Sequence, residues 1–407
     1  MKRILSFFFV LFLYFQVYTQ NNKNWITDLD TLEHCFLQKE QLFIHFSKRK
    51  FKEEIKKLKD TTFQTSEEKF WSLNSLFAKF NNHVFSLENL DFNRFPFEIK
   101  KFQGSYYLIS IPQKFSFLLG YKLQKINGFP LKKILKYSSN SNNINIKSYL
   151  DFYQFSKSDT LRLTLLSTNK TTTTIKLPYI SKYNFEEMVK VIPTKTPFYL
   201  EKKARWFWQY GINFGQQVYF KYNIGLSKEF IDNTMDSLQV SEITLAKNYH
   251  LSLQQIYDAP SFDNFTKKLF LKFKKRRYKK LFIDFRNNSS GNVLAFKKFI
   301  KKIKKTKRIN NKNRLFLLVD KTVASSVIET ILVLQKETHA KIIGEEVTGI
   351  SCSTDKIKSF YLPNSAFKIY YPSQKFKTVT LKPNVFVNYT FNHYKNGVDP
   401  ILQKALE

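Results

Sequence analysis

Serine residues that follow an apolar run are the side chains of this sequence best placed to do chemistry. In 315-LFLLVDKTVASSVIE-329 an apolar strand pattern ends, and Ser325 and Ser326 open a helical pattern. A serine at a helix N-terminus lies beside N–H groups and the positive end of the helix dipole, which stabilise the charge that develops in acyl transfer. Serine is also a favoured N-cap residue, so a purely structural role is the alternative.

Two further segments end a strand pattern in small or polar residues. In 281-LFIDFRNNSSGN-292 a buried-strand pattern leads into a small-residue turn, where backbone N–H groups can face an oxyanion. An ordinary turn between a strand and a helix has the same pattern. The segment 341-KIIGEEVTG-349 is a strand stopped by glycine and indicates only a tight loop.

These segments belong to a part of the chain, from about residue 216, in which strand and helix patterns alternate. Such alternation is typical of parallel βα units, where catalytic groups gather at the carboxyl ends of the strands. We expect strands at 218–222, 281–285, 315–319 and 341–343, and helices near 262–277, 293–305 and 325–338.

The first half of the chain divides into a helical segment and a β-rich module. Residues 26–90 have a helical pattern, with Phe70, Leu73, Phe77 and Phe80 on one face. Apolar runs at 106–111, 118–126 and 160–180 then indicate strands, and the Ser/Asn-rich residues 138–146 indicate a loop insertion.

The first 20 residues have the pattern of a secretory signal. Met1-Lys2-Arg3 precedes an apolar run from Ile4 to Tyr18, which is shorter than the ~20 residues that span a bilayer. We therefore expect cleavage near residue 20, no membrane span in the mature chain, and export to the periplasm or the extracellular space. An uncleaved anchor is the alternative, because no Ala-x-Ala site is present.

The composition predicts a folded and strongly basic protein. The chain has 407 residues, of which 43% are hydrophobic, and its net charge is +35. The abundant Phe, Lys, Asn and Ile all have AT-rich codons, so genomic composition explains much of the positive charge. The lysines of 293–308 fall on the polar face of a helical pattern. We therefore expect no nucleic-acid partner. Binding to an anionic surface polymer is a third hypothesis beside the two developed below.

Cysteine usage excludes two kinds of site. Only Cys35 and Cys352 are present, so there is no disulfide framework and no metal site built on clustered cysteines. We expect no cofactor and no metal.

Motifs in four parts of the chain resemble those of the C-terminal processing, or tail-specific, serine proteases. The family's Asp-x-Arg-x-Asn-x-Gly-Gly motif is similar to Asp284, Arg286, Asn288 and Ser290-Gly291. Its nucleophile segment aligns with 323–325, which places the nucleophile on Ser325 with Ser326 as runner-up. Residues 116–135 are similar to a strand of the PDZ-like module of these proteases, and 362–406, with Gly397, Asp399 and Pro400, to their closing segment.

This resemblance implies an architecture and an activity. The implied fold is α/β: a signal peptide at 1–20, a helical N-terminal segment at 21–95, a β-rich PDZ-like module with a loop insertion at 96–182, and a ClpP/crotonase-like catalytic domain at 183–407. The implied activity is that of an exported serine-type endopeptidase acting on polypeptides. The resemblance assigns the oxyanion to the backbone N–H groups of Gly291 and Ser326.

The general base differs between branches of this family. Members with a Ser/Lys dyad have a lysine 25 residues after the nucleophile, where this sequence has Ile350. The tricorn-core-like branch uses a histidine on an N-terminal segment, and residues 70–83, ending in Asn81-Asn82-His83, resemble that segment. The resemblance therefore makes His83 the general base, since an imidazole can take up and return a proton near neutral pH.

Several positions depart from the family pattern. Asn81 replaces an acidic residue, and Ser289 and Ser290 replace glycines. Val347 and Ile350 interrupt the Gly-Glu-x-Thr-x-Gly pattern, and Asn384 replaces an aspartate. The alternative to a protease is thus a catalytically degenerate relative that acts as an extracytoplasmic peptide-binding protein.

Overall fold

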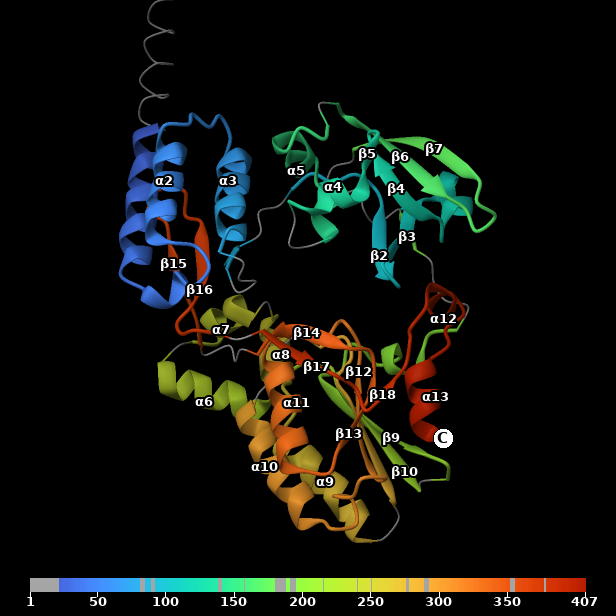
Figure 1. Cartoon of the computed structure of the whole chain (residues 1–407). Coiled ribbons are helices and arrows are strands. Elements are labelled where there is room, and N and C mark those ends of the chain that lie inside the picture. Colours follow the sequence, from blue (N-terminus) through green and yellow to red (C-terminus); the bar gives the residue numbers. More distant parts are fainter. Residues whose placement is uncertain are drawn as a thin grey trace, which may run out of the picture. The chain divides into compact units, whose positions relative to one another are not determined.

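The computed structural model (Figure 1) divides the chain into two compact units. Unit 1 contains Met1–Val191 and Lys356–Lys375, and unit 2 contains Ile192–Asp355 and Phe376–Glu407. The structure describes residues 22–80, 85–88, 92–137, 141–156, 158–179, 188–190, 195–214, 216–239, 241–249, 251–275, 278–288, 293–351, 356–376 and 378–407. The expected signal peptide and His83 lie outside these residues.

Unit 1 begins with helices packed around phenylalanine side chains. Residues 22–37 are helical and are followed by η1 (Glu40–Leu42), α2 (Lys48–Lys59) and α3 (Ser66–Ala78). Thr65 and Glu68 form a capping box that fixes the start of α3. Phe36 is fully buried, and its ring contacts those of Phe51 and Phe77 at 5.7 and 5.9 Å. The expected helical segment is confirmed, although its end forms the short strand β1 (Ser86–Leu87).

A mixed module of strands and short helices completes most of unit 1. Its sheet has the order β2-β3-β4-β6-β7, with β5 paired to β4 and β8 to β3. The strands are β2 (Glu98–Phe102), β3 (Ser105–Pro112), β4 (Lys122–Ile126), β5 (Phe129–Pro130), β6 (Thr160–Leu166), β7 (Thr172–Pro178) and β8 (Met188–Lys190). The helices are η2 (Gln113–Leu118), α4 (Leu131–Leu135), η3 (Ser141–Asn145) and α5 (Lys147–Phe152). The expected strands are confirmed, whereas part of the expected loop insertion at 138–146 forms η3.

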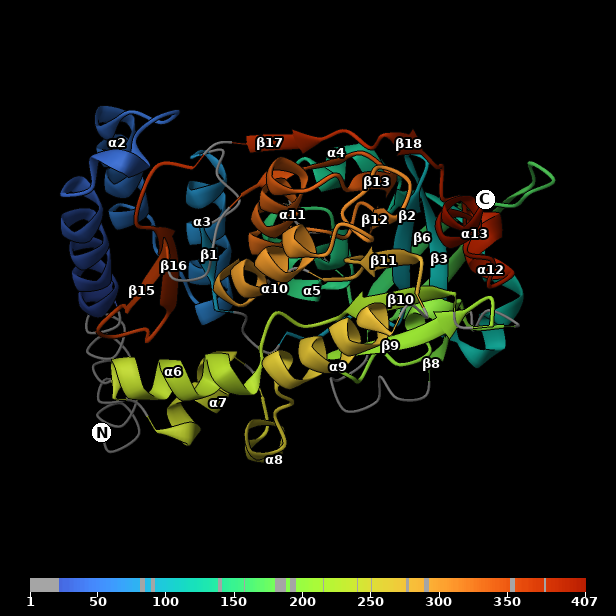
Figure 2. The ribbon, with the colours of Figure 1, turned by 90° about the horizontal axis from the view of Figure 1, so that it is seen from below.

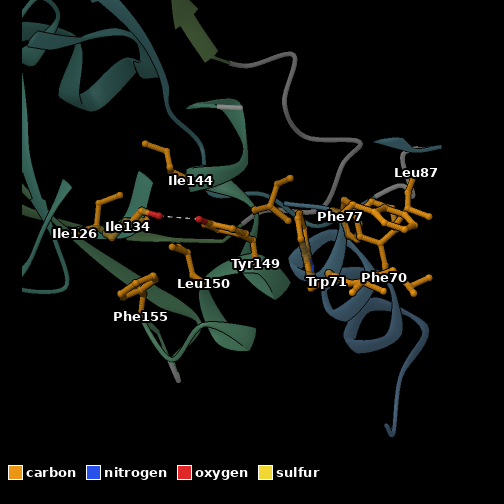
Figure 3. Packing of buried hydrophobic residues seen from close by; sticks show 14 of the residues in the cluster. Phe70, Trp71, Phe77, Leu87, Ile126, Ile134, Ile144, Tyr149, Leu150 and Phe155 are labelled. Carbon is orange, nitrogen blue, oxygen red and sulfur yellow. Dashed lines mark hydrogen bonds between the residues drawn. The ribbon is translucent and has the colours of Figure 1, made fainter. Parts of the chain in front are cut away.

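The helical segment and the β-rich module share one hydrophobic core. Trp71 of α3 packs edge-on against Tyr149 of α5 with ring centroids 5.1 Å apart, and Tyr149 donates a hydrogen bond of 2.8 Å to the carbonyl of Ile134 (Figure 3). Because these buried side chains belong to one continuous cluster, the two sequence segments fold as a single unit.

A hairpin from late in the sequence also belongs to unit 1. Strands β15 (Ile357–Tyr361) and β16 (Lys368–Pro372) pair with each other, and β16 pairs with β1. The buried carboxylate of Asp28 accepts hydrogen bonds of 2.8 Å from the backbone N–H groups of Asn364 and Ser365 at the hairpin turn. The sequence analysis had placed these residues in the C-terminal domain.

Unit 2 is built on a six-stranded sheet of order β18-β13-β12-β11-β10-β9. All neighbouring strands are parallel except β9, which pairs antiparallel with β10. The strands are β9 (Phe207–Ile212), β10 (Gln217–Tyr222), β11 (Lys280–Asp284), β12 (Leu315–Val319), β13 (Lys341–Gly344) and β18 (Val385–Phe386). The expected parallel sheet is therefore confirmed.

Helices cover both faces of this sheet because its strands alternate their buried side chains between two clusters. One cluster joins Phe220 and Ile283 to α9 (Phe262–Lys274), α10 (Val293–Lys305) and α11 (Ser326–Glu337), which lie beside one another in Figure 2. The other joins Tyr219 and Phe282 to η5 (Phe198–Leu200) and α13 (Pro400–Leu406). The unit is thus a three-layer α/β fold.

The remaining elements of unit 2 surround this core. They are α6 (Lys228–Leu238), α7 (Glu242–Tyr249), α8 (Leu253–Tyr257), α12 (Phe391–Lys395) and the antiparallel pair β14 (Val347–Ile350) and β17 (Thr378–Leu381). Among the described residues of both units, no helix has the length and apolar character needed to cross a membrane.

Gly344 permits the close pairing of β13 with β12. Its φ is +140°, and a Cβ atom at this position would lie 1.8 Å from the carbonyl oxygen of Val319. Val319 ends the strand that leads to Ser325, so this contact fixes the point where the serine loop leaves the sheet.

Gly344→Ala is expected to destabilise unit 2 by about 3 kcal/mol or more, because backbone atoms that cannot move aside oppose the added methyl group. Gly349→Ala in the same unit is the control: its Cβ would meet only the flexible end of Ile328, 2.8 Å away, and the expected loss is below about 1 kcal/mol. Urea unfolding of both variants measures the difference. Equal losses would contradict the role given to Gly344.

Candidate active site

Three loops meet at one edge of the unit 2 sheet. They follow β11, β12 and β13, which are adjacent and parallel, so their carboxyl ends lie side by side. The loops begin at Phe285, Asp320 and Glu345. This edge is where open α/β sheets place ligands and catalytic groups.

Ser325 occupies a strained position between strand β12 and helix α11. Its backbone angles are φ 53° and ψ −129°, although it carries a side chain. Non-glycine residues in such sparsely populated regions cost about 1–3 kcal/mol and persist only where the surrounding structure enforces them. A strained serine on a sharp turn from strand to helix is also the geometry of a nucleophile elbow. Ser325 is half-buried.

Ser326, the alternative nucleophile, is fully buried. It is the first residue of α11, and its carbonyl oxygen accepts a hydrogen bond of 3.0 Å from the Thr330 hydroxyl. Of the two serines, Ser325 is the one whose side chain solvent reaches.

The Asp-x-Arg-x-Asn motif forms a buried ionic network beneath the same edge. The guanidinium of Arg286 donates to both carboxylate oxygens of Asp399, at 2.6 and 2.8 Å, and also to the carboxylate of Asp284, at 2.5 to 3.1 Å. Its face lies 4.0 Å from the ring centroid of Tyr199. Tyr219 donates a hydrogen bond of 2.5 Å to Asp284. All these side chains are buried.

Electrostatics keep this network ionised despite its burial. Burial works against the charge on Asp284, but Arg286 and Lys221 outweigh it, so the pKa of Asp284 lies below its usual range. Burial likewise opposes the charge on Arg286, yet the two carboxylates raise its pKa. Burial and the Asp284 charge raise the pKa of Tyr219, which keeps its hydroxyl protonated as a donor.

Two buried polar side chains hold the backbone that follows β11. The ammonium group of Lys221 donates to the carbonyl oxygens of Arg286, at 2.5 Å, and Asp284, at 3.4 Å. The Asn288 amide donates a hydrogen bond of 2.9 Å to the carbonyl of Tyr222. These bonds fix the backbone of the described residues from Asp284 to Asn288.

A side-chain hydrogen bond links the loop after β11 to the serine loop. The backbone N–H of Asn287 donates to the Thr322 hydroxyl at 2.6 Å, and that hydroxyl donates to the carboxylate of Asp320. Asp320 also accepts from the backbone N–H of Thr322 at 3.1 Å. Asn287 has a φ of 54°, so the bond holds a second residue in the left-handed region.

The third loop contributes a buried acid. Glu345 is 6% exposed and pairs with Lys321 at 3.1 Å, and its N–H donates to the carbonyl of Val319 at 3.2 Å. Burial raises the pKa of the Glu345 carboxyl, against the opposing effect of Lys321.

The structure describes some of the residues that the sequence analysis proposed for the site and not others. Ser325 and Ser326 lie at the sheet edge described above, whereas His83 and Gly291 fall outside the described residues. Ile350 of β14 pairs with Thr378 of β17. Asn384 accepts a hydrogen bond of 2.7 Å from the backbone N–H of Ile342 in β13.

Sequence reasoning missed Lys221, Tyr219, Asp320 and Thr322. Lys221 carried a usable signal, because it is the one charged residue in the apolar strand 218-VYFKY-222. A lysine in a fully buried strand needs polar partners, and here these are backbone carbonyls and Asp284.

Asp284→Asn is expected to lower the free energy of unfolding of unit 2 by about 3–5 kcal/mol at pH 7, because Arg286 then keeps one carboxylate instead of two. The folded-state pKa of Asp284 is lowered, so its stabilising contribution is present above the unfolded value near 3.9 and is lost as the pH falls through the folded value. The variant should therefore lose less stability than the wild type between pH 5 and pH 3, as read by urea unfolding at several pH values.

Asp263→Asn is the matched control, since its ion pair with Lys298, at 3.0 Å, is exposed. Its expected cost is below about 1 kcal/mol. If both variants lost the same amount, the buried network would not be the constraint described here.

Comparison with known proteins gives matches among solved structures. No family model matches the chain, and no curated protein sequence matches it. The structure of mature CPAF complexed with lactacystin matches with a TM-score of 0.60 and 12% identity over 94% of this chain and 98% of that one. A second structure of mature CPAF matches with a TM-score of 0.58, 11% identity, and 94% and 96% coverage. The photosystem II D1 C-terminal processing protease gives a TM-score of 0.35, 12% identity, and 82% and 86% coverage.

The CPAF match extends over nearly the whole of both chains, so this mixed α/β chain has the fold of CPAF along most of its length.

Proposed function

We propose that this protein is an exported serine endopeptidase of the tail-specific type, with Ser325 as its nucleophile. The observation that carries the proposal is the strained backbone of Ser325 at the turn from the central strand β12 into α11. A structural N-cap does not need this conformation: Ser227, Ser252 and Ser261 cap helices of the same unit with extended backbones. They also accept hydrogen bonds from backbone N–H groups of the helices they cap.

In this proposal the reaction is an acyl transfer in two halves. The Ser325 hydroxyl attacks the scissile carbonyl while His83 takes up its proton, and His83 then gives that proton to the leaving amine. Water, activated by His83 in the same way, hydrolyses the acyl-enzyme and releases the second peptide. His83 belongs by sequence to unit 1 and Ser325 to unit 2, so the proposal requires these two residues to meet in the catalytic state.

The oxyanion would be held by the N–H groups of Ser326 and Gly291. The N–H of the residue after the nucleophile is the usual donor at a strained elbow. The other donor in this proposal is the N–H of Gly291. Lys221, Asn288 and Thr322 hold the described residues that precede it in the sequence. The buried side chains thus serve as positioning residues and do not themselves react.

A cavity in unit 1 favours peptide binding as the second candidate function. It has a volume of about 340 Å³ and lies along β2, the terminal strand of its sheet in the described part of the chain. Arg94, Phe97, Lys100 and Ile144 are among its lining residues. A cavity that lies along a strand and is lined by apolar and charged side chains can hold an extended peptide. This function is compatible with a protease and would remain in a degenerate relative.

Labelling with a fluorophosphonate probe tests the proposed nucleophile. The wild-type chain is expected to be labelled, and Ser325→Ala is expected to lose the label. His83→Ala should react at least about 100-fold more slowly, because general-base catalysis contributes a factor of that size. Ser326→Ala and Ser252→Ala are controls that should keep the label, the first because Ser326 is buried and the second because Ser252 only caps α8. Mass spectrometry of the labelled peptide identifies the modified residue.

If the folded wild type stayed unlabelled while a competent serine protease reacted, the peptidase proposal would fail. Binding of an extended peptide along β2 would then be the function to pursue. Unchanged labelling of His83→Ala would reject His83 as the base but leave Ser325 as the nucleophile.

Thr322→Val is expected to slow labelling of Ser325 about tenfold, because it removes the hydroxyl that joins Asn287 to Asp320 and so loosens both loops. Thr322→Ser keeps that hydroxyl and should restore the rate. Thermal unfolding run beside the kinetics separates positioning from folding: a rate that follows only the melting temperature would show that Thr322 is merely structural.

A further inference from the structure

The two ends of the unit 2 sheet differ in charge. At the carboxyl ends of its strands, the carboxylates of Asp284, Asp320 and Glu345 lie together with the cations Lys221, Arg286 and Lys321, so both signs of charge are present there. At the opposite ends, residues 272–280 and 301–314 contain many lysines and arginines and no acidic residue. The positive charge of this unit is therefore concentrated at the end away from Ser325.

The strand register places these basic segments side by side. Lys280, at the start of β11, pairs with Gln217 of β10; Leu315 of β12 pairs with Leu281; and Lys341 of β13 pairs with Phe316. Helices α9 and α10 precede β11 and β12 in the chain, and Figure 1 shows both helices in the lower part of the unit. We call this surface the basic pole and define it by six exposed side chains: Lys275, Lys279, Lys305, Lys307, Lys312 and Arg314.

An acidic residue also lies near this surface. Glu337 ends α11 and pairs with Lys304 at 3.2 Å, and both side chains are exposed. One carboxylate does not offset the surrounding lysines, so the pole keeps a strong positive potential.

An exposed aromatic hairpin belongs to the same end of the sheet. The turn between β9 and β10 contains Phe214, whose side chain is fully exposed at 108%, and Tyr210 of β9 is 51% exposed. The turn directly precedes Gln217, the residue that pairs with Lys280, and Gln216 accepts a hydrogen bond of 2.6 Å from the Lys279 N–H. The aromatic tip therefore adjoins the basic pole.

The backbone of this tip makes the phenylalanine more unusual. Asn213 and Phe214 have φ values of 50° and 54°. Glycine or asparagine is favoured in this region, and other side chains cost about 1–2 kcal/mol there. Phe214 thus carries two free-energy costs: its apolar ring is exposed to water, and its backbone has a positive φ. An exposed apolar residue on an ordinary strand or helix carries only the first of these costs.

We propose that the basic pole and Phe214 dock unit 2 on an anionic phospholipid membrane. Lysines bind the headgroups and an exposed aromatic ring enters the boundary with the acyl chains, which is the pairing that holds peripheral proteins on lipid. A ring that projects from a hairpin tip suits insertion into lipid, whereas single-stranded nucleic acid needs aromatic platforms inside a basic groove. Docking by this pole leaves the edge with Ser325 at the opposite end of the sheet from the membrane. The inference does not depend on the proposed peptidase activity.

Cosedimentation with lipid vesicles tests this proposal. The chain from residue 21 is used, because residues 1–20 would partition into lipid on their own and their removal keeps every described residue. It is expected to bind vesicles of phosphatidylcholine with 30% phosphatidylglycerol and to bind pure phosphatidylcholine far less, with binding that weakens as salt rises. The triple variant Lys305→Gln, Lys307→Gln, Lys312→Gln should bind about 100-fold more weakly, since each lysine near an anionic surface contributes about a factor of five.

Phe214→Gly is the decisive second variant, because glycine adopts the positive φ of this turn without a steric penalty. Its binding should fall about tenfold. Two controls match these changes elsewhere: Phe117→Gly removes another exposed aromatic ring, and the triple Lys50→Gln, Lys52→Gln, Lys56→Gln removes three exposed lysines of α2. Both should bind as the unchanged chain does.

Two outcomes would overturn the proposal. Equal losses for the α2 triple and the pole triple would mean that net charge alone attracts the protein to lipid. Loss of binding in the pole triple but not in Phe214→Gly, together with equal affinity for a soluble polyanion such as heparin, would make the surface a general polyanion site.

Discussion

The buried ion cluster of Arg286 with Asp284 and Asp399 is the constraint on which the described part of the site depends. Desolvating these groups carries a penalty of several kcal/mol per ion, which is recovered only when every donor and acceptor is satisfied. Tyr219, Tyr199 and Lys221 complete that requirement here. Because Asp399 also caps α13 through the Leu402 N–H, the cluster ties the end of β11 to the C-terminal helix.

A series of short hydrogen bonds connects this cluster to the loop that contains Ser325. Lys221 holds the carbonyls of 284 and 286, the next residue donates to Thr322, and Thr322 is joined to Asp320 at the end of β12. On the other side, Gly344 lets β13 approach Val319 closely. A backbone as strained as that of Ser325 persists only when its surroundings fix it from several directions, and these bonds provide that.

The sequence predicted the sheet well and the network poorly, for a physical reason. Strands β10 to β13 and the helices between them follow from local hydrophobic patterns, which are visible within a few residues. The partners of Arg286 include a residue 113 positions away, and the lysine that supports it lies 65 positions earlier. The same limit explains the β15–β16 hairpin, whose pairing with β1 joins segments almost 300 residues apart and depends on tertiary packing.

The costly features of this edge bear on whether the site is active or degenerate. A buried ion pair can often be replaced by apolar side chains with no loss of stability, and a strained serine can relax to glycine or to an extended cap with a gain of about 1–3 kcal/mol. A chain that only binds peptides at the β2 edge of unit 1 has no need of either feature in unit 2. Their presence together, at the carboxyl ends of adjacent strands, therefore favours retained chemistry at Ser325 over a purely structural edge. One departure from the motifs that the sequence resembles, Asn384, makes its own backbone hydrogen bond beside β13 and leaves the network intact.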